Sequence, residues 1–496
     1  MNFISGFGHK FSLSHSLKSL ALPVVTGLLL FLVVASTAKA QHPNIVVIFA
    51  DDLGYGDVSG YGATKIATPN IDHFATQGMK FTEAHAAASL CSPSRYGLLT
   101  GRAPWRLHKK GNGYRLKPGD MTIAAFLKNS GYKSAAIGKW HLGYSKDWNK
   151  PPIQGPLEVG FDYHFGVPSN HNDSDRVFIE DHDIYGRTPG VEFRRVNKGK
   201  ELPEGVDKPR VEDQVDTMLT TKAVEFIRRN ASNPFFLYFT PCAPHTHVTP
   251  DASFRGSSKA GLYGDHVQEL DSHVATILKT LDDLDLADNT LVIFTSDNGS
   301  TPKDFKGTQG TQLNLADDSD DIRQRFKTAK ADAKKLGHVT NGQWRDGKGY
   351  AYEGGHRVPF IARWPGHIKP GTSSDCTITM TDLFATFAEI VGQDLPEKEA
   401  PDSFSLLPVL LGNAEKVDGR ESIFILGNGK DSAVAVCGGK WKLIVRYGDA
   451  ADKGHELYDL STDPGEQKNI AADHPDVVKR LADAYQDAES AGQTRP

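Results

Sequence analysis

The sequence predicts an α/β fold: a mixed, mostly parallel β-sheet sandwiched between helices, with a small C-terminal subdomain of antiparallel strands and a helix. Continuous apolar runs at 44–50 and 234–239 are typical of central strands that are covered on both faces. Stretches with the apolar spacing of helices alternate with these runs, as a parallel sheet requires. Beyond residue 412, short strand-like runs between glycine-rich turns indicate an antiparallel meander.

The individual elements follow from these patterns in chain order. We expect helices at 68–77, 122–129, 211–230, 263–285, 381–391 and 477–488. We expect strands of the main sheet at 44–50, 132–138, 234–239, 289–294 and 360–364. The strands predicted for the C-terminal meander are 422–426, 433–437, 441–446 and 456–459.

The composition is that of an ordinary globular protein. With 496 residues, of which 39% are hydrophobic and 24% charged, the chain is long enough for a large core or for two domains. A net charge of -5 without a long basic run gives no indication of a nucleic-acid partner. Four cysteines in so long a chain are not a disulfide framework, and any pairing among Cys242, Cys376 and Cys437 stays open.

The first 40 residues have the pattern of a signal peptide. Lys10 and Lys18 precede an apolar run at 20–34, and Ala38-Lys39-Ala40 supplies the small residues of a cleavage site. The apolar run is short for a membrane span. We therefore expect cleavage near Ala40, export to the periplasm or the medium, and no stable membrane anchor.

Oxygen-bearing side chains follow two of the predicted strands at their carboxyl ends, where open α/β sheets place their sites. Asp51 and Asp52 follow the first strand, and Asp297 and Asn298 follow the fourth. Two adjacent aspartates would repel each other unless a cation or hydrogen-bond donors lay between them. Four oxygen donors select a hard cation such as calcium or magnesium over zinc or copper.

Basic side chains follow the two remaining early strands. Lys139 and His141 come after the second strand, and His245 and His247 come after the third. The last two histidines could bind zinc, but no further Cys/His pair at suitable spacing supports such a site. Considered alone, the pair of Lys139 and His141 is more typical of a surface turn than of a functional site.

The most unusual string of the chain begins at Cys91 and has the letters CSPSRYGLLTGR. Pro93 fixes its own φ and biases the residue before it towards an extended conformation. Arg95 is always charged and can clamp an oxyanion through two N–H groups, and the leucines beyond it suit a buried helix. The string thus places a potential nucleophile beside a fixed guanidinium, although a small buried cysteine at a helix start is the plainer alternative.

This string resembles the signature of the type I (formylglycine-dependent) sulfatases. Further motifs in the same order are similar to other elements of that family: Gly138-Lys139-Trp140-His141-Leu142-Gly143, Pro244-His245, Gly347-Lys348 and Glu353-Gly354-Gly355-His356-Arg357. Matching stretches run from Asp51 nearly to Glu466, and the trailing segments look most like arylsulfatases and N-acetylgalactosamine-6-sulfatases. The resemblance implies an alkaline-phosphatase-like fold, with a signal peptide at 1–40, a catalytic domain at 41–412 and a C-terminal subdomain at 413–496.

The resemblance also implies an activity, the hydrolysis of a sulfate monoester of a carbohydrate or an aryl alcohol. It implies that a formylglycine-generating enzyme converts Cys91 to formylglycine, whose hydrate supplies the nucleophilic hydroxyl. The ligands implied for one calcium ion are Asp51, Asp52, Asp297, Asn298 and Cys91.

The same resemblance assigns roles to the basic residues. Arg95 and Lys139 would hold charge near the sulfate and the nucleophile. Lys348 and His245 would stabilise or protonate the leaving oxygen. His141 would take the proton of the second hydroxyl when sulfate is expelled.

Two alternatives stay open. Three aspartates against a divalent cation, Arg95, Lys139 and Lys348 leave roughly +2, which suits a monoanionic ester but does not separate sulfate from phosphate. A phosphonate or phosphodiester hydrolase of the same superfamily is therefore the second enzyme hypothesis. A module that binds sulfated glycans without cleaving them is the non-enzymatic hypothesis, and its expected mark would be erosion of the catalytic positions.

Two long segments have no clear periodic pattern. The stretch 146–209 is rich in Pro, Gly, Asn, Asp and His, and we expect it to face the substrate. Its segment Phe165-Gly166-Val167-Pro168 resembles a sulfatase element that is followed by a small polar residue touching the sulfate, and the resemblance implies Asn170 or His171 for that contact. The stretch 302–340 is acidic at 317–321 and basic at 323–335, and we expect it to be a solvated helix with a loop.

Overall fold

A computed structural model describes residue 10 and residues 42–107, 113–196, 202–301, 320–427 and 432–495, with the side chains of 320–324 and 327 excepted. The predicted signal peptide and the first half of the 302–340 segment lie outside the described residues. In the ranges that are described, no helix has the length and apolar character needed to cross a membrane.

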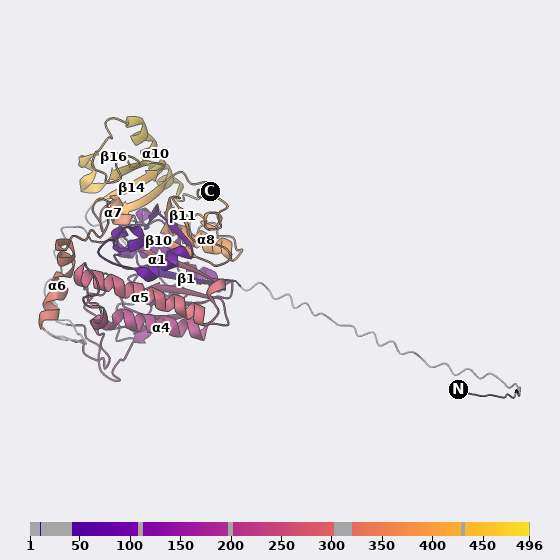
Figure 1. Cartoon of the computed structure of the whole chain (residues 1–496), viewed down its shortest axis with the longest axis vertical. Helices are drawn as coiled ribbons and strands as arrows, with labels where there is room; N and C mark the ends of the chain where they lie inside the picture. Colours follow the sequence, from indigo (N-terminus) through magenta and orange to yellow (C-terminus); the bar gives the residue numbers. More distant parts are fainter. Residues whose placement is uncertain are drawn as a thin grey trace, which may run out of the picture. The chain divides into compact units, whose positions relative to one another are not determined.

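A ten-stranded sheet lies at the centre of the protein (Figure 1). Its strands are β1 (Asn44–Ala50), β2 (Met79–Phe81), β4 (Lys133–Gly138), β5 (Tyr163–Gly166), β6 (Ile179–Glu180), β7 (Asp183–Ile184), β8 (Phe235–Thr240), β9 (Thr290–Ser296), β10 (Phe360–Arg363) and β11 (Thr372–Ser374). The strand order is β11-β2-β10-β9-β1-β8-β4-β5-β6-β7. The run from β9 to β5 is parallel, whereas β10 is antiparallel to both neighbours and β6 is antiparallel to β5 and β7. The predicted mixed, mostly parallel sheet is confirmed.

Helices cover both faces of this sheet. One face carries α2 (Cys91–Thr100), α3 (Ile123–Lys128) and α8 (Leu383–Ile390), together with the short strands β3 (Ala84–His85) and β12 (Ile378–Thr379). The other carries α1 (Pro69–Thr76), α4 (Val215–Arg229) and α5 (Gly261–Asp283). Figure 1 shows α4 and α5 lying side by side on their face of the sheet. These helices lie within one to three residues of the predicted ranges, except where short turns precede them.

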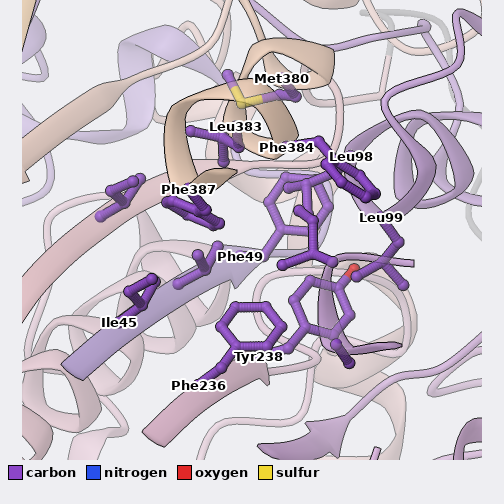
Figure 2. Packing of buried hydrophobic residues seen from close by; sticks show 14 of the residues in the cluster. Ile45, Phe49, Leu98, Leu99, Phe236, Tyr238, Met380, Leu383, Phe384 and Phe387 are labelled. Atoms are coloured by element: carbon purple, nitrogen blue, oxygen red, sulfur yellow. The ribbon is translucent and has the colours of Figure 1, made fainter. Parts of the chain in front are cut away.

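The two faces of β1 fill two separate cores, because successive side chains of a strand point in opposite directions. Ile45, Val47 and Phe49 contribute to one core, and Val46 and Ile48 contribute to the other; all five are fully buried. Figure 2 shows the first core, in which Ile45 and Phe49 lie among side chains of β8, α2 and α8. Burial on both faces explains why the strand is apolar throughout.

The 302–340 segment differs from the expected solvated helix. Its helix α6 (Asp320–Lys335) buries Phe326, Ala329 and Ala333, which join the same core as α5. These positions recur at the spacing of one helical face. The prediction was wrong for this face, because the abundance of charge in the segment hid a short apolar stripe.

A four-stranded antiparallel sheet forms the C-terminal part, as predicted. It consists of β13 (Ile423–Gly427), β14 (Ala433–Gly438), β15 (Trp441–Arg446) and β16 (Glu456–Asp459), in that order. Leu481 and Tyr485 of α10 (Pro475–Ala491) pack on one face of the sheet, and Ala351 and Tyr352 pack on the other. The short helices α7 (Glu353–His356) and α9 (Leu407–Leu410) precede this sheet in the chain.

All four cysteines of the chain are free and buried. No disulfide therefore joins any two of Cys242, Cys376 and Cys437. This answers the question of their pairing, which the sequence left open.

A buried ion network joins the C-terminal sheet to α7. The Lys442 ammonium, on β15, lies 2.8 Å from Glu353 Oε1 and 2.8 Å from Glu466 Oε1. The backbone N–H of Glu353 donates to Glu466 Oε2 at 2.7 Å. All three side chains are fully buried. Glu353 has a second cation in Arg357, whose Nη1 donates to its Oε2 at 3.1 Å, whereas Lys442 is the cation that the two carboxylates share.

Lys442→Met should lower the free energy of unfolding by about 3–5 kcal/mol, because it leaves the carboxylates of Glu353 and Glu466 buried without their shared cation. The matched control is Lys440→Met on the adjacent turn, where an exposed pair with Asp459 contributes at most about 1 kcal/mol. Urea denaturation of both variants measures the difference. Equal losses in the two variants would contradict the structural role given to Lys442.

Candidate active site

Four neighbouring strand ends bring together the side chains that the sequence singled out. Because β9, β1, β8 and β4 are adjacent and parallel, their carboxyl ends meet at one edge of the sheet. The residues that follow these ends are Asp297 and Asn298, Asp51 and Asp52, His245, and Lys139 and His141, respectively. The first turn of α2 adds Cys91 and Arg95, and a loop before α7 adds Lys348.

Three buried ion pairs organise the cluster. Arg95 donates two hydrogen bonds to Asp297 Oδ2, from Nε at 2.9 Å and from Nη2 at 2.7 Å. The ammonium of Lys139 lies 2.8 Å from both carboxylate oxygens of Asp51. The ammonium of Lys348 donates to Asp52 Oδ1 at 2.6 Å. Each aspartate therefore has one cation in hydrogen-bond contact.

The charges of the cluster depend on these pairs. Burial alone raises the pKa of Asp52, but the Lys348 ammonium and the neighbouring basic groups outweigh it and hold that pKa well below its usual value. Burial lowers the pKa of Lys139 and of Lys348, yet contact with Asp51 and Asp52 reverses the effect and raises both. Asp52 and both lysines are therefore charged at neutral pH.

Cys91 lies at the centre of this cluster. It is the first residue of α2, and its Sγ is 3.4 Å from Asp51 Oδ1, 3.5 Å from Asp52 Oδ1 and 3.0 Å from the Lys348 ammonium. Burial raises the pKa of its thiol, so the unmodified side chain would stay protonated and would be a poor nucleophile. The position is central, but the thiol itself is not activated.

The chain just before Cys91 is held from two sides. The backbone N–H of Ser89 donates to the carbonyl of Leu426 on β13 at 2.9 Å. The carbonyl of Ser89 accepts a hydrogen bond of 2.7 Å from the N–H of Gly349, next to Lys348. The C-terminal sheet thus fixes the approach to residue 91, which the sequence did not predict.

Two histidines border the cluster. His245 Nε2 lies 3.8 Å from Asp52 Oδ2. Nδ1 of His141 is buried and has no hydrogen-bond partner in the described residues. Burial lowers the pKa of both rings, and the nearby lysine cations lower it further. Both imidazoles are therefore neutral at pH 7 and each can accept a proton.

The oxygen atoms that the sequence predicted as cation ligands do converge. Nδ2 of Asn298 donates to Asp52 Oδ1 at 2.9 Å, while its Oδ1 is buried and has no hydrogen-bond partner in the described residues. Asp51, Asp52, Cys91 and His245 also offer ligand atoms that all lie within 4.8 Å of one another. A buried amide oxygen without a partner, beside three carboxylates, fits a hard cation.

One basic residue of the cluster was missed by sequence reasoning. Lys330, on α6, places its ammonium 4.0 Å from Asp52 Oδ2. In the sequence it is one of several lysines in a charged stretch, and nothing in its own neighbours marks it. The apolar spacing of Phe326, Ala329 and Ala333 was the available signal, because it places residue 330 at the edge of the buried face.

The prediction for Asn170 or His171 finds no support in the contacts. His171 Nε2 lies 3.0 Å from Glu212 Oε2 and is buried in a separate polar cluster. In the part of the chain that the structure describes, neither residue forms a hydrogen bond or ion pair with the groups around Cys91.

Comparison with known proteins agrees with this arrangement. The model of the family described as Sulfatase matches residues 43–393, which is most of the chain. The chain belongs to the sulfatase family. A sulfatase of this family is a sulfuric ester hydrolase. A second model, described as N-sulphoglucosamine sulphohydrolase, C-terminal, matches residues 342–490 of this sulfatase.

Two relatives of this sulfatase are similar to it over most of its length. An N-acetylgalactosamine-6-O-sulfatase of Bacteroides thetaiotaomicron is 34% identical, covering 91% of this chain and 94% of its own. Human arylsulfatase A is 32% identical and covers 91% of this chain and 89% of its own.

Solved structures show the same fold. One from work on glycosaminoglycan metabolism by Bacteroides thetaiotaomicron has a TM-score of 0.79 and 34% identity, covering 91% of this chain and all of its own. The phosphonate monoester hydrolase of Agrobacterium radiobacter has a TM-score of 0.60 at 18% identity, covering 91% of this chain and 96% of its own. At that identity the likeness extends to the fold alone.

Proposed function

We propose that this sulfatase removes sulfate from a sulfated carbohydrate, using residue 91 as the nucleophile. The observation that carries the proposal is the placement of Cys91 within hydrogen-bond distance of Asp51, Asp52 and Lys348, at the meeting point of three buried ion pairs. The first substrate to test is a 6-O-sulfated hexosamine. The 34% identity to an N-acetylgalactosamine-6-O-sulfatase over 94% of that protein's length supports this choice.

Formylglycine at residue 91 is part of the proposal. The conversion requires a formylglycine-generating enzyme as a partner during maturation, and the hydrated aldehyde supplies a hydroxyl nucleophile. The Lys348 ammonium, 3.0 Å from the side chain of residue 91, places positive charge where the nucleophile and the sulfate meet. Arg95 and Lys139 keep Asp297 and Asp51 in place around the same point.

The histidines have separate proposed roles. His245 faces Asp52 Oδ2. Together with Lys348, it would stabilise or protonate the leaving oxygen. His141, whose Nδ1 has no hydrogen-bond partner in the described residues, would accept the proton that residue 91 gives up. The role of His141 requires the neutral imidazole that burial favours. A neutral His245 ring would stabilise the leaving oxygen by donating a hydrogen bond, and the Lys348 ammonium would be the source of the proton.

We propose calcium as the single cation, held by Asp51, Asp52, Asp297, Asn298 and residue 91. Bound calcium would polarise a sulfate oxygen and lower the pKa of a hydroxyl at residue 91. The unpartnered Oδ1 of Asn298 supports a ligand role for that side chain.

The substrate side of the site suits a sulfated sugar. A cavity of about 610 Å³ borders His141 and Ser92. Its lining includes the cationic side chains of Arg115 and Lys146 and the ring of Trp148. Cations bind sulfate groups. The Trp148 ring itself is buried between Phe193 and the Arg195 guanidinium.

The remaining parts of the proposal concern organisation and location. We propose a signal peptide at 1–40 that directs export to the periplasm or the medium. The proposed domain boundary lies between 412 and 413, after the catalytic domain. An exported enzyme would meet sulfated polysaccharides or their fragments.

The choice between sulfate and phosphate esters has a direct kinetic test. The kcat/KM of protein made with formylglycine-generating enzyme should be at least about 100-fold higher for 4-nitrophenyl sulfate than for 4-nitrophenyl phosphate, because the proposed site stabilises the transition state of sulfate-ester hydrolysis. A preference for phosphate or phosphonate esters would favour the second enzyme hypothesis. Retained binding of sulfated glycans without hydrolysis of any ester would favour a binding module.

The calcium proposal predicts a change in thermal stability. Calcium at about 100 times its Kd should stabilise the protein by about 2.7 kcal/mol and raise its Tm, and EGTA should reverse the shift. Asn298→Ala should weaken calcium binding at least about tenfold because it removes one oxygen ligand. The control is Asn289→Ala, at an exposed position after α5. An unchanged Tm on adding calcium to the native protein would contradict the proposal.

A further inference from the structure

Lys330 reaches the catalytic cluster from the helix α6. Its ammonium lies 4.0 Å from Asp52 Oδ2, 3.3 Å from the Thr301 hydroxyl and 5.5 Å from the centroid of the Tyr263 ring. The side chain is only 12% exposed. The apolar face of α6 packs against the core, so core packing fixes where this ammonium lies.

The ammonium of Lys330 has no carboxylate in hydrogen-bond contact among the described residues. Each of the three aspartates of the cluster already has another cation at 2.8 Å or less. The other contacts of Lys330, the Thr301 hydroxyl and the Tyr263 ring, are uncharged. A buried cation without an anion in hydrogen-bond contact is costly to keep. The arrangement fits a cation whose partner arrives with the substrate.

The position of Lys330 differs from that of Lys348. Lys348 contacts Asp52 Oδ1 and the side chain of residue 91. Lys330 faces Asp52 Oδ2, the oxygen that His245 also faces at 3.8 Å. If His245 acts on the leaving oxygen, Lys330 lies on the side of the alcohol that leaves. It is therefore placed to contact the sugar and not the attacking group.

The charge of the pocket leads to the same conclusion. Arg95, Lys139, Lys348 and Lys330 are balanced by Asp51, Asp52 and Asp297 together with the buried Asp57, which hydrogen-bonds the Tyr263 hydroxyl beside Lys330. A divalent cation would bring the local charge to roughly +2, whereas a sulfate monoester carries a single negative charge. A substrate with a second negative charge near its ester would balance this pocket better.

We propose that Lys330 binds a second anionic substituent of the sugar that carries the scissile sulfate. The substrate class is then a hexosamine with two acidic groups, and Lys330 is a specificity-determining residue. The inference rests on the proposed sulfatase function of the same site. It adds to that function a substrate preference that comes from Lys330 on helix α6.

The test compares substrates with one and two negative charges. The native enzyme should have a higher kcat/KM for N-acetylgalactosamine 4,6-disulfate or 3,6-disulfate than for the 6-sulfate. Lys330→Met should lower kcat/KM for the preferred disulfate by about 10- to 100-fold, mainly through KM, because one charge-assisted hydrogen bond is lost. Its kcat/KM for the 6-sulfate and for 4-nitrophenyl sulfate should fall by a smaller factor, because these esters lack the second anionic group.

Two further variants separate specificity from folding. Lys334→Met removes an exposed lysine of the same helix and should change none of these values. Lys330→Arg keeps the charge and should keep part of the preference for the disulfate. The Tm of Lys330→Met should be at or above that of the native enzyme, because the lost cation had no close anion.

The outcomes are distinct. Hydrolysis of no sulfate ester by the native enzyme would overturn the proposed function itself. Hydrolysis of 4-nitrophenyl sulfate without any preference for a disulfate would overturn the role of Lys330 and leave the sulfatase function standing. An equal loss on all three kinds of substrate in Lys330→Met would assign the residue to the ester or the cation site, and would also overturn the inference.

Discussion

The buried charge balance at the ends of β1 and β9 is the constraint on which the site depends. Asp51, Asp52 and Asp297 are all fully buried, and three such carboxylates would repel one another without compensation. Arg95, Lys139 and Lys348 supply one cation each, from α2, from the end of β4 and from the loop before α7. Three separate parts of the chain must therefore fold correctly before the carboxylates can be held together.

The same constraint explains the position of residue 91. Its side chain lies between two of these carboxylates and the Lys348 ammonium, and the backbone before it is held by β13 through Ser89. The C-terminal sheet is therefore part of the site's framework. Its own attachment depends on the buried Lys442 and its two glutamates.

The residues of the site could largely be predicted from the sequence, because apolar runs mark parallel strands and the carboxyl ends of such strands meet at one edge. Asp51 and Asp297 were found in this way, whereas Lys139 and His245 were assigned through the resemblance to the sulfatases. Lys330 could not be found, since its role depends on how α6 packs against α5 and not on any local motif. The contacts of Ser89 and Lys442 were missed for the same reason: they join segments distant in sequence.

The central claim is that residue 91 acts as a modified cysteine, and the mass of the peptide containing Cys91 tests it most directly. In protein made with a formylglycine-generating enzyme, we expect a loss of about 18 Da relative to the unmodified peptide, because CH₂SH becomes CHO at the nucleophile. The fraction of peptide with this loss should increase in step with the rate of sulfate release. An unmodified thiol at residue 91 in protein that hydrolyses sulfate esters would contradict the account.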